Sequence, residues 1–180
     1  MIVDVGTGDG RAVLARAAEE PRAVVIGVDA AAASMSEASR RADRRGPRNV
    51  LFLAAGVETL PGSPLAGTAD LVTVAFPWGS LLRGVLGLDQ SALCGLASVA
   101  RPGAHFELLV SVVPADGIAG IERLDASSRP AIEGAWASAG IKLISMREAT
   151  SADVAATSSS WARRLGPDRP VWRLDGVRSG

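Results

Sequence analysis

The chain has 180 residues, of which 48% are hydrophobic and 21% charged. This balance excludes a disordered chain, and the length fits one globular domain over residues 1–180. Nineteen basic and nineteen acidic residues cancel, so net charge does not indicate a nucleic-acid partner, and local clusters of charge must be considered instead. The single cysteine, Cys94, excludes an internal disulfide framework and predicts a cytoplasmic protein with a buried thiol. No apolar run reaches the ~20 residues that a membrane span needs.

The first predicted unit is a strand, a glycine-rich turn and a helix. A strand over 2–5 leads into the turn Gly6-Thr7-Gly8-Asp9-Gly10, and residues 11–19 are expected to be helical. The glycines let the backbone approach a ligand at the start of that helix. The dinucleotide fingerprint is G-x-G-x-x-G, whereas this turn reads G-x-G-x-G and follows Asp4. It resembles motif I of the S-adenosylmethionine (SAM) methyltransferases. Because Met1 directly precedes the strand, we expect either a minimal domain or one that lacks an N-terminal extension.

The second strand and helix carry two further candidates. A strand over 23–28 ends in Asp29, about 20 residues after the glycines, where an acid can accept hydrogen bonds from both ribose hydroxyls. Asp29 could equally cap the next helix, expected over 31–45. The distal end of that helix carries a cationic cluster of Arg40, Arg41, Arg44 and Arg45. Residues at i, i+4 share one face of a helix, so the cluster suits either the helix dipole and solvent or contacts to phosphates.

Alternating strands and helices continue to the end of the chain. Further strands are expected over 49–54, 69–75, 105–112, 141–146 and 169–174, and helices over 81–86, 90–99, 129–139 and 151–164. Residues 101–104 are expected to form a turn, and Trp136 to lie in the core. This order predicts an α/β fold of the class I SAM-dependent methyltransferase type, a Rossmann-like, mostly parallel sheet of seven strands with helices on both faces. Glu58, after the third strand, is placed near the adenine of such a cofactor or faces solvent.

Two tryptophans fit no apolar period. Trp78 lies in Phe76-Pro77-Trp78-Gly79-Ser80, directly after the fourth strand, and Trp161 lies in a serine-rich segment between the last two strands. Both map to the carboxyl edge of the sheet, where open α/β sheets bind ligands. Two facing rings beside a methyl donor would hold an extruded base. The alternative is that each ring only covers a loop.

The segment after the fourth strand also lacks features of other methyltransferases. Enzymes that methylate an adenine amino group place a D/N-P-P-Y/F motif there, but Phe76 replaces the acid or amide and Trp78 the second proline. No cysteine nucleophile of the pyrimidine-C5 type is nearby. A ring nitrogen such as adenine N1, whose lone pair attacks directly, is therefore the expected acceptor. The protein would then act by flipping, stacking and aligning the base.

Three motifs together resemble the 16S rRNA (adenine(1408)-N(1))-methyltransferases, an aminoglycoside-resistance family of the kanamycin–apramycin type. They are G-T-G-D-G over 6–10, F-P-W-G-S-L-L over 76–82 and S-W-A-R-R-L over 160–165. The resemblance covers nearly the whole chain and implies SAM as cofactor, N1 of adenine 1408 in the 30S subunit as target, and resistance to aminoglycosides. The family carries a hairpin before the first strand that helps form its rRNA-docking face, and residues 1–180 begin at that strand.

The resemblance also implies site residues. The flipped adenine would lie between Trp78 and Trp161, in a pocket completed by Phe76, Pro77 and Ser159. The expected cofactor residues are Asp4, Gly6, Thr7, Gly8, Asp9, Gly10, Asp29, Ala30, Val57, Glu58 and Ser80. The expected RNA-binding residues are Arg40, Arg41, Arg44, Arg45, Arg163, Arg164 and Arg169, of which Arg169 would hold the phosphate of the flipped nucleotide.

Two other functions stay open at this point. A small-molecule methyltransferase of the same fold would need neither the arginine cluster nor a second tryptophan. An RNA-binding module with a vestigial cofactor site would not need the intact glycine motif with Asp29 and Glu58. We expect the rRNA methyltransferase, acting as a monomer on 16S rRNA within the 30S subunit, without a metal and without a membrane partner.

Overall fold

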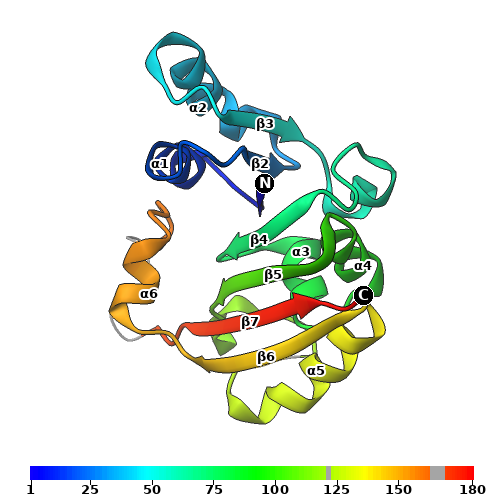
Figure 1. Ribbon diagram of the computed structural model, residues 1–180. Helices are drawn as coiled ribbons and strands as arrows, with labels where there is room; N and C mark the ends of the chain where they lie inside the picture. Colours follow the sequence, from blue (N-terminus) through cyan, green and yellow to red (C-terminus); the bar gives the residue numbers. More distant parts are fainter. Residues whose placement is uncertain (121–122, 163–168) are drawn as a thin grey trace.

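The computed structural model describes residues 1–120, 123–162 and 169–180. Over this part of the chain it contains one seven-stranded sheet of order β3-β2-β1-β4-β5-β7-β6 (Figure 1). Strands β1 to β5 pair in parallel, and β7 pairs antiparallel with both β5 and β6. The predicted Rossmann-like, mostly parallel sheet is confirmed. The strands are β1 (Ile2–Val5), β2 (Val25–Asp29), β3 (Val50–Ala54), β4 (Ala69–Ala75), β5 (Ala100–Val110), β6 (Ile141–Glu148) and β7 (Trp172–Arg178).

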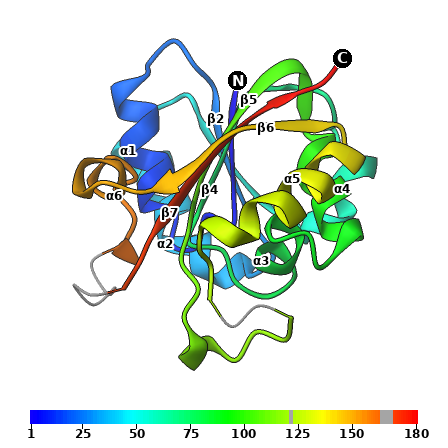
Figure 2. The same ribbon diagram turned by 90° about the horizontal axis from the view of Figure 1, so that it is seen from below.

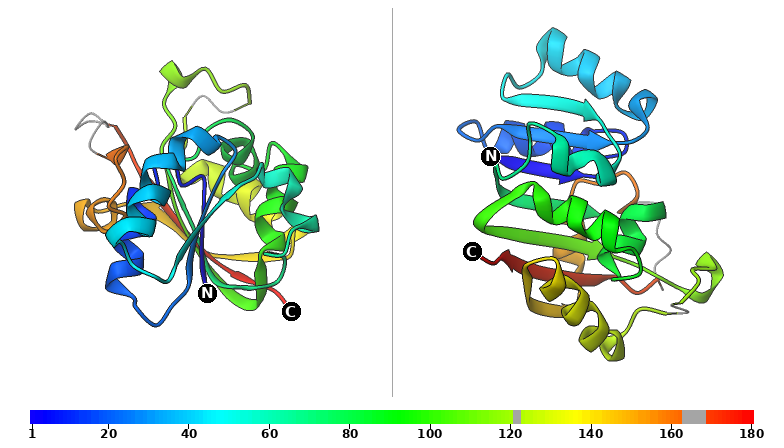
Figure 3. Two further views of the ribbon diagram at one scale, coloured as in Figure 1. Left: turned by 90° about the horizontal axis from the view of Figure 1, so that it is seen from above. Right: turned by 90° about the vertical axis from the view of Figure 1, so that its right-hand side faces the viewer.

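Helices cover both faces of this sheet. Figures 2 and 3 show α1, α2 and α6 on one face and α3, α4 and α5 on the other. The α-helices are α1 (Arg11–Glu19), α2 (Ala32–Arg45), α3 (Gly79–Val85), α4 (Gln90–Ser98), α5 (Arg129–Ser138) and α6 (Ser151–Ala156). Short 3-10 helices in the described ranges include η1 (Val57–Gly62), η2 (Pro114–Asp116) and η3 (Ala126–Ser128). No helix in the described ranges is both long and apolar enough to cross a bilayer.

The main core lies between the sheet and the layer of α3, α4 and α5. Trp136 is fully buried there, as predicted, and its Nε1 donates a hydrogen bond of 2.9 Å to the Val85 carbonyl, which ties α5 to α3. The prediction for Cys94 was wrong, because its side chain is exposed. The side chains of Leu93 and Leu96 are buried in the core. Cys94 lies about 100° around the helix from Leu93, on the side that faces solvent.

Several predicted boundaries differ from the structure. Strand β5 already begins at Ala100 and includes the expected turn over 101–104. Strand β7 begins at Trp172 and not at Arg169. The expected helix over 151–164 was wrong beyond Ala156, where α6 ends. Four hydroxyl side chains follow in a row, and such side chains compete with a helix for backbone hydrogen bonds.

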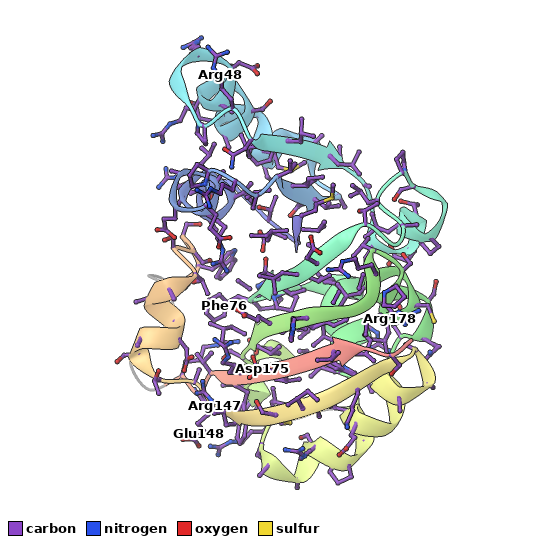
Figure 4. All side chains as sticks on the ribbon, viewed as in Figure 1. Arg48, Phe76, Arg147, Glu148, Asp175 and Arg178 are labelled. Carbon is purple, nitrogen blue, oxygen red and sulfur yellow. The ribbon has the colours of Figure 1, made fainter. Side chains whose placement is uncertain are left out.

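Asn49, directly before β3, holds the connection between α1 and β2. Its side-chain amide donates to the carbonyls of Ala17, Glu20 and Ala23 at 3.1, 3.0 and 2.6 Å. Asn49→Ala leaves these carbonyls without this partner, so we expect a loss of about 1–3 kcal/mol in the free energy of unfolding, measured by urea denaturation. Arg48→Ala, at the exposed neighbour labelled in Figure 4, is the control and should change stability by less than about 0.5 kcal/mol. Equal effects of the two substitutions would contradict this role.

Candidate functional site

The strand order reverses between β1 and β4 (Figure 1). A pocket lies at this point, lined by residues that follow both strands. Ligands bind at this point of open α/β sheets, outside the carboxyl ends of the strands. The pocket has a volume of about 490 Å3, within the range of small-molecule sites. Every predicted cofactor residue except Gly10 lines it, together with all five residues expected to hold the base. Gly10 instead precedes α1, and a Cβ there would lie 2.7 Å from both Ala38 and Phe52.

Two glycines of the first turn have different roles. Gly6 and Gly8 have φ of 78° and 57°, in the left-handed region that favours glycine. A Cβ on Gly6 would meet Leu81 Cδ2 at 2.7 Å, so this glycine allows the turn to pack against α3. A Cβ on Gly8 would have no atom within 4 Å. The space beside Gly8 is therefore part of the pocket, where a ligand can approach the backbone.

This difference predicts the effect of Gly8→Ala. The matched control is Gly67→Ala, because Gly67 has φ of 67°, has equally open space and lies outside this pocket. Both substitutions should destabilise the fold by about 1–2 kcal/mol, the strain of a left-handed alanine. Only Gly8→Ala should weaken SAM binding, measured by calorimetry. If both variants bind SAM equally well, the space beside Gly8 does not hold the cofactor.

Asp29 holds the glycine turn and the start of α2 together. Its Oδ2 accepts the Gly8 N–H at 2.8 Å, and its Oδ1 accepts the Ala31 N–H at 2.8 Å. Asp29 is thus not the N-cap of α2, because α2 begins at Ala32 with Ala31 as its cap residue. Each carboxylate oxygen can accept a second hydrogen bond. Asp29 can therefore accept hydrogen bonds from the two hydroxyls of a ribose without releasing its backbone partners.

Asp4 lies deeper, in the floor of the pocket. It accepts a hydrogen bond of 2.6 Å from Thr73 Oγ1 on the neighbouring strand β4. Burial raises the pKa of the Asp4 carboxyl above its ordinary value, although the hydrogen bond from Thr73 opposes this shift. Asp4 therefore links β1 to β4 beneath the glycine turn.

The remaining predicted cofactor residues surround the pocket mouth. Val57 is buried in η1 while Glu58, next to it, is exposed. Ala30 is exposed directly after β2, and Ser80 is exposed in the first turn of α3. Prediction from the sequence missed Ser34 of α2, which also lines the pocket. No motif marks Ser34, because only the packing of α2 beside the glycine turn brings it there.

The two tryptophans lie side by side at the rim, as predicted. Trp78 and Trp161 have ring centroids 5.8 Å apart, an interplanar angle of 40°, and 48% and 40% exposure. A base stacked between two rings needs about 3.5 Å on each side, or about 7 Å in all. In this state the rings therefore lie too close to admit a base. They must separate by about 1 Å and become parallel when one enters.

Phe76 brings Trp78 to the rim through a strained turn. Its φ of 54° is unusual for a bulky residue, and such outliers concentrate at functional sites. The Phe76 ring is buried, and its N–H donates to the Leu109 carbonyl at 2.8 Å. Figure 4 shows Phe76 at the carboxyl end of β4. The buried Phe76 and Pro77 anchor the turn, and Trp78 is left exposed directly before α3.

Trp161 lies in a segment whose hydroxyl side chains accept hydrogen bonds from backbone N–H groups two residues away. Ser158 has φ of 52°. Thr157 Oγ1 accepts the Ser159 N–H at 3.2 Å, and Ser159 Oγ accepts the Trp161 N–H at 3.2 Å. Ser159 thus supports Trp161 directly. The predicted RNA-binding residues Arg163 and Arg164 lie outside the described residues.

The arginines of the predicted cluster have different surroundings in the structure. Arg41 and Arg44 line an open groove of about 890 Å3 between α1 and α2, together with Arg11. The described residues that line this groove include no carboxylate. Arg40 instead turns back onto its own helix, where its Nε donates to the Ser36 carbonyl at 3.2 Å. The side chain of Arg45 lies outside the described set.

Arg169 occurs beside the site but already has protein partners. Its Nη2 lies 2.6 Å from Asp116 Oδ2, and its Nε donates to Ser111 Oγ at 2.8 Å. Partial burial acts to raise the pKa of Asp116, but the hydrogen bond and charge of Arg169 and the Val113 N–H outweigh it and hold this pKa below its ordinary value. A phosphate would compete with Asp116 for the guanidinium. The sequence carried no signal for this pairing.

Comparison with known proteins identifies the family. The family model described as NpmA, 16S rRNA (adenine(1408)-N(1))-methyltransferase, matches residues 1–174. The chain belongs to this family. A 16S rRNA (adenine(1408)-N(1))-methyltransferase from Streptoalloteichus tenebrarius is 37% identical over 179 residues, which cover 94% of this chain and 81% of that protein. An enzyme of the same name from Escherichia coli is 28% identical, and the match covers 97% of this chain and 85% of that protein.

Solved structures of the family are similar throughout. A tryptophan-to-alanine mutant of the 16S rRNA (adenine(1408)-N(1))-methyltransferase from Catenulisporales acidiphilia, crystallised with SAM, has a TM-score of 0.89 and 34% identity. It covers 99% of this chain, which matches 85% of that one. The 16S rRNA methyltransferase KamB has a TM-score of 0.87 and 36% identity, with coverage of 99% and 87%. The fold is that of the class I methyltransferases, and the family resemblance seen in the three motifs is confirmed.

Proposed function

We propose that this protein transfers a methyl group from SAM to N1 of adenine 1408 in 16S rRNA. The observation that carries the proposal is the pair Trp78 and Trp161 at the rim of the pocket that Asp29 and the glycine turn form. Family membership supports the reaction and its rRNA substrate. We also propose that the substrate is the assembled 30S subunit, that the protein acts as a monomer without a metal, and that it confers aminoglycoside resistance.

The residues of the pocket fit the cofactor. The open space beside Gly8 admits a ligand to the backbone, and Asp29 has acceptor capacity left for a ribose. Val57 and Glu58 line the same pocket, and we assign them to the adenine of the cofactor. SAM supplies an electrophilic methyl group on its sulfonium. The pocket residues bind and orient it, with the glycine turn and Asp29 on one side and Ser80 on the other.

The residues at the rim hold the acceptor. Trp78 and Trp161 separate and stack on the two faces of the flipped adenine, while Phe76, Pro77 and Ser159 keep the rings in place. Adenine N1 carries a lone pair and no proton at neutral pH, so no side chain needs to act as a base. Catalysis then depends on alignment. The product bears a positive charge and added bulk on the base edge, which excludes drugs that must contact that edge.

The test is methyl transfer to purified subunits. The protein is incubated with tritiated SAM and 30S subunits, and the modified position is mapped by primer extension. We expect a stop at adenine 1408 and loss of binding of aminoglycosides that contact it. Label at another nucleotide, or no label on RNA while SAM still binds, would overturn the proposal.

The groove between α1 and α2 is the proposed RNA-docking surface. Arg11, Arg41 and Arg44 line it, and Ser158 joins it to the tryptophan segment. The double variant Arg41→Glu, Arg44→Glu should weaken 30S binding strongly and leave SAM affinity unchanged. Each lost phosphate contact should also reduce the slope of log affinity against log salt by about 0.7–0.9.

A control with the same change of net charge separates docking from general electrostatics. The control is the double variant Arg22→Glu, Lys142→Glu. Arg22 is exposed before β2, and Lys142 is exposed at the start of β6, so both lie away from the carboxyl edge. Binding of 30S subunits is measured by filter retention over a range of salt concentrations. Equal losses in the two double variants would show that the groove does not dock the RNA.

A further inference from the structure

The helix that leads to Trp161 has no hydrophobic anchor. Helix α6 spans only Ser151–Ala156, and none of its residues is buried. A helix of this length is not stable without tertiary contacts. Val154 is only half-buried, so polar contacts must contribute to holding α6 against the sheet.

Asp153 supplies that attachment. Its carboxylate accepts the N–H and the hydroxyl of Thr150 at 2.7 Å each, which closes a capping box at the start of α6. It also forms a bidentate pair with Arg147 of β6, with contacts of 2.8 and 2.9 Å. Arg173 of β7 donates to it at 3.2 Å. The side chain is 11% exposed, and one carboxylate thus joins the helix to two strands.

The sheet in turn holds the arginines in position. Arg173 Nε donates to Asp175 Oδ1 at 2.8 Å, and Asp175 Oδ2 accepts a hydrogen bond of 2.7 Å from Ser145. Figure 4 labels Arg147 at the end of β6 nearest to α6 and Asp175 farther along the neighbouring strand β7. Glu107 of β5 lies 3.5 Å from Arg173 Nη2. Asp153 is therefore attached to β6 and β7, and Arg173 extends this cluster to β5.

A series of hydrogen bonds in the segment after α6 connects this helix to Trp161. Thr157 Oγ1 donates to the Val154 carbonyl at 2.8 Å and accepts the Ser159 N–H. Ser159 Oγ then accepts the Trp161 N–H. These local contacts couple the place of Trp161 to the place of α6, and the ring of Trp161 also contacts that of Trp78. A change in the position of α6 therefore acts on the contact between the two rings.

We propose that Asp153 is a positioning residue for methyl transfer, which fixes α6 on the sheet and thereby holds Trp161 opposite Trp78. This inference rests on the proposed function, because it assigns Trp161 to the flipped base. It goes beyond that function by naming an attachment outside the pocket on which the base-holding pair depends. Asp153 itself lines a separate cavity between α1, α6 and the sheet, and does not touch the SAM pocket.

The first test is a double-mutant cycle on methyl transfer to 30S subunits. Asp153→Asn keeps the size of the side chain but removes the charge that pairs with both arginines, and kcat should fall at least fivefold while SAM affinity stays within twofold. In a Trp161→Ala background the same substitution should cause no further loss. Asp153→Glu, which retains the charge, should recover part of the activity. An equal loss in both backgrounds would overturn the inference, because Asp153 would then act independently of Trp161.

The second test needs no RNA. Acrylamide quenching of Trp161 is taken as the difference between the protein and its Trp161→Phe variant, and Asp153→Asn should increase it. Unchanged quenching would overturn the inference. This outcome does not depend on whether the protein methylates rRNA. The matched control is Asp125→Asn. Asp125 also caps a short helix, because it accepts the Ser127 N–H, but that helix is η3 and not α6. Should Asp153→Asn not fold, Arg147→Met tests the same link with the carboxylate intact.

Discussion

Trp78→Ala and Trp161→Ala are each expected to slow methylation of 30S subunits by about 5- to 150-fold. The loss of one stacked base–ring contact, worth about 1–3 kcal/mol, sets this range. Both rings are exposed at the rim, 48% and 40%, so their removal should leave the free energy of unfolding nearly unchanged. SAM affinity should also stay within about twofold. Tritium incorporation under single-turnover conditions measures the effect, and calorimetry measures SAM binding.

Conservative variants separate stacking from other roles of the two rings. Trp78→Phe and Trp161→Phe keep an aromatic face and should retain most of the activity. Because the rings are 5.8 Å apart and tilted by 40°, a base must part them before it can stack. Binding of 30S subunits should therefore change the fluorescence of the pair in the native protein. Full activity of both alanine variants would show that the base is held elsewhere.

Asp29→Ala is expected to weaken SAM binding by a factor of 100 or more. Hydrogen bonds to a charged group contribute about 1.5–3 kcal/mol each, and Asp29 offers acceptors for two ribose hydroxyls. The substitution also removes the acceptor for the Gly8 and Ala31 N–H groups, so the turn itself loses its support. Calorimetric titration with SAM or S-adenosylhomocysteine measures the loss.

A ligand comparison separates these two effects of Asp29. In the native protein, 2′-deoxy-S-adenosylhomocysteine should bind more weakly than the normal nucleoside, because one hydroxyl contact is missing. In Asp29→Ala the two ligands should bind equally. A persistent difference in the variant would show that another group holds the ribose, and that Asp29 acts only on the turn.

The sequence predicted the elements whose signals are local. A β-branched strand before three closely spaced glycines, and an acidic residue after the next strand, indicate a nucleotide site without knowledge of the fold. Strand β4 and helix α1 were predicted with the bounds that the structure has. Trp78 and Trp161 fit no apolar period, and this placed both rings at the carboxyl edge of the sheet before their contact was known.

Local signals were less reliable where several hydroxyl residues follow one another. The sequence pattern over 151–164 favoured a long helix beginning at a serine, whereas Thr150 is the actual cap and α6 ends at Ala156. The spacing of Thr150 and Asp153 is that of a capping box and could have located this start. The run of hydroxyl residues over 157–160 could have indicated the end, because such side chains compete with a helix for backbone hydrogen bonds.

The sequence by itself determined the family, the cofactor turn and the pair of tryptophans, because each depends on residue types at short fixed spacings. Only the tertiary structure decided which charges act and which are paired. It left Arg41 and Arg44 facing a groove, turned Arg40 onto its own helix and gave Arg169 a carboxylate partner. It also joined Asp153 to two arginines from different strands. Such pairings depend on distances between segments far apart in the chain, which no local pattern encodes.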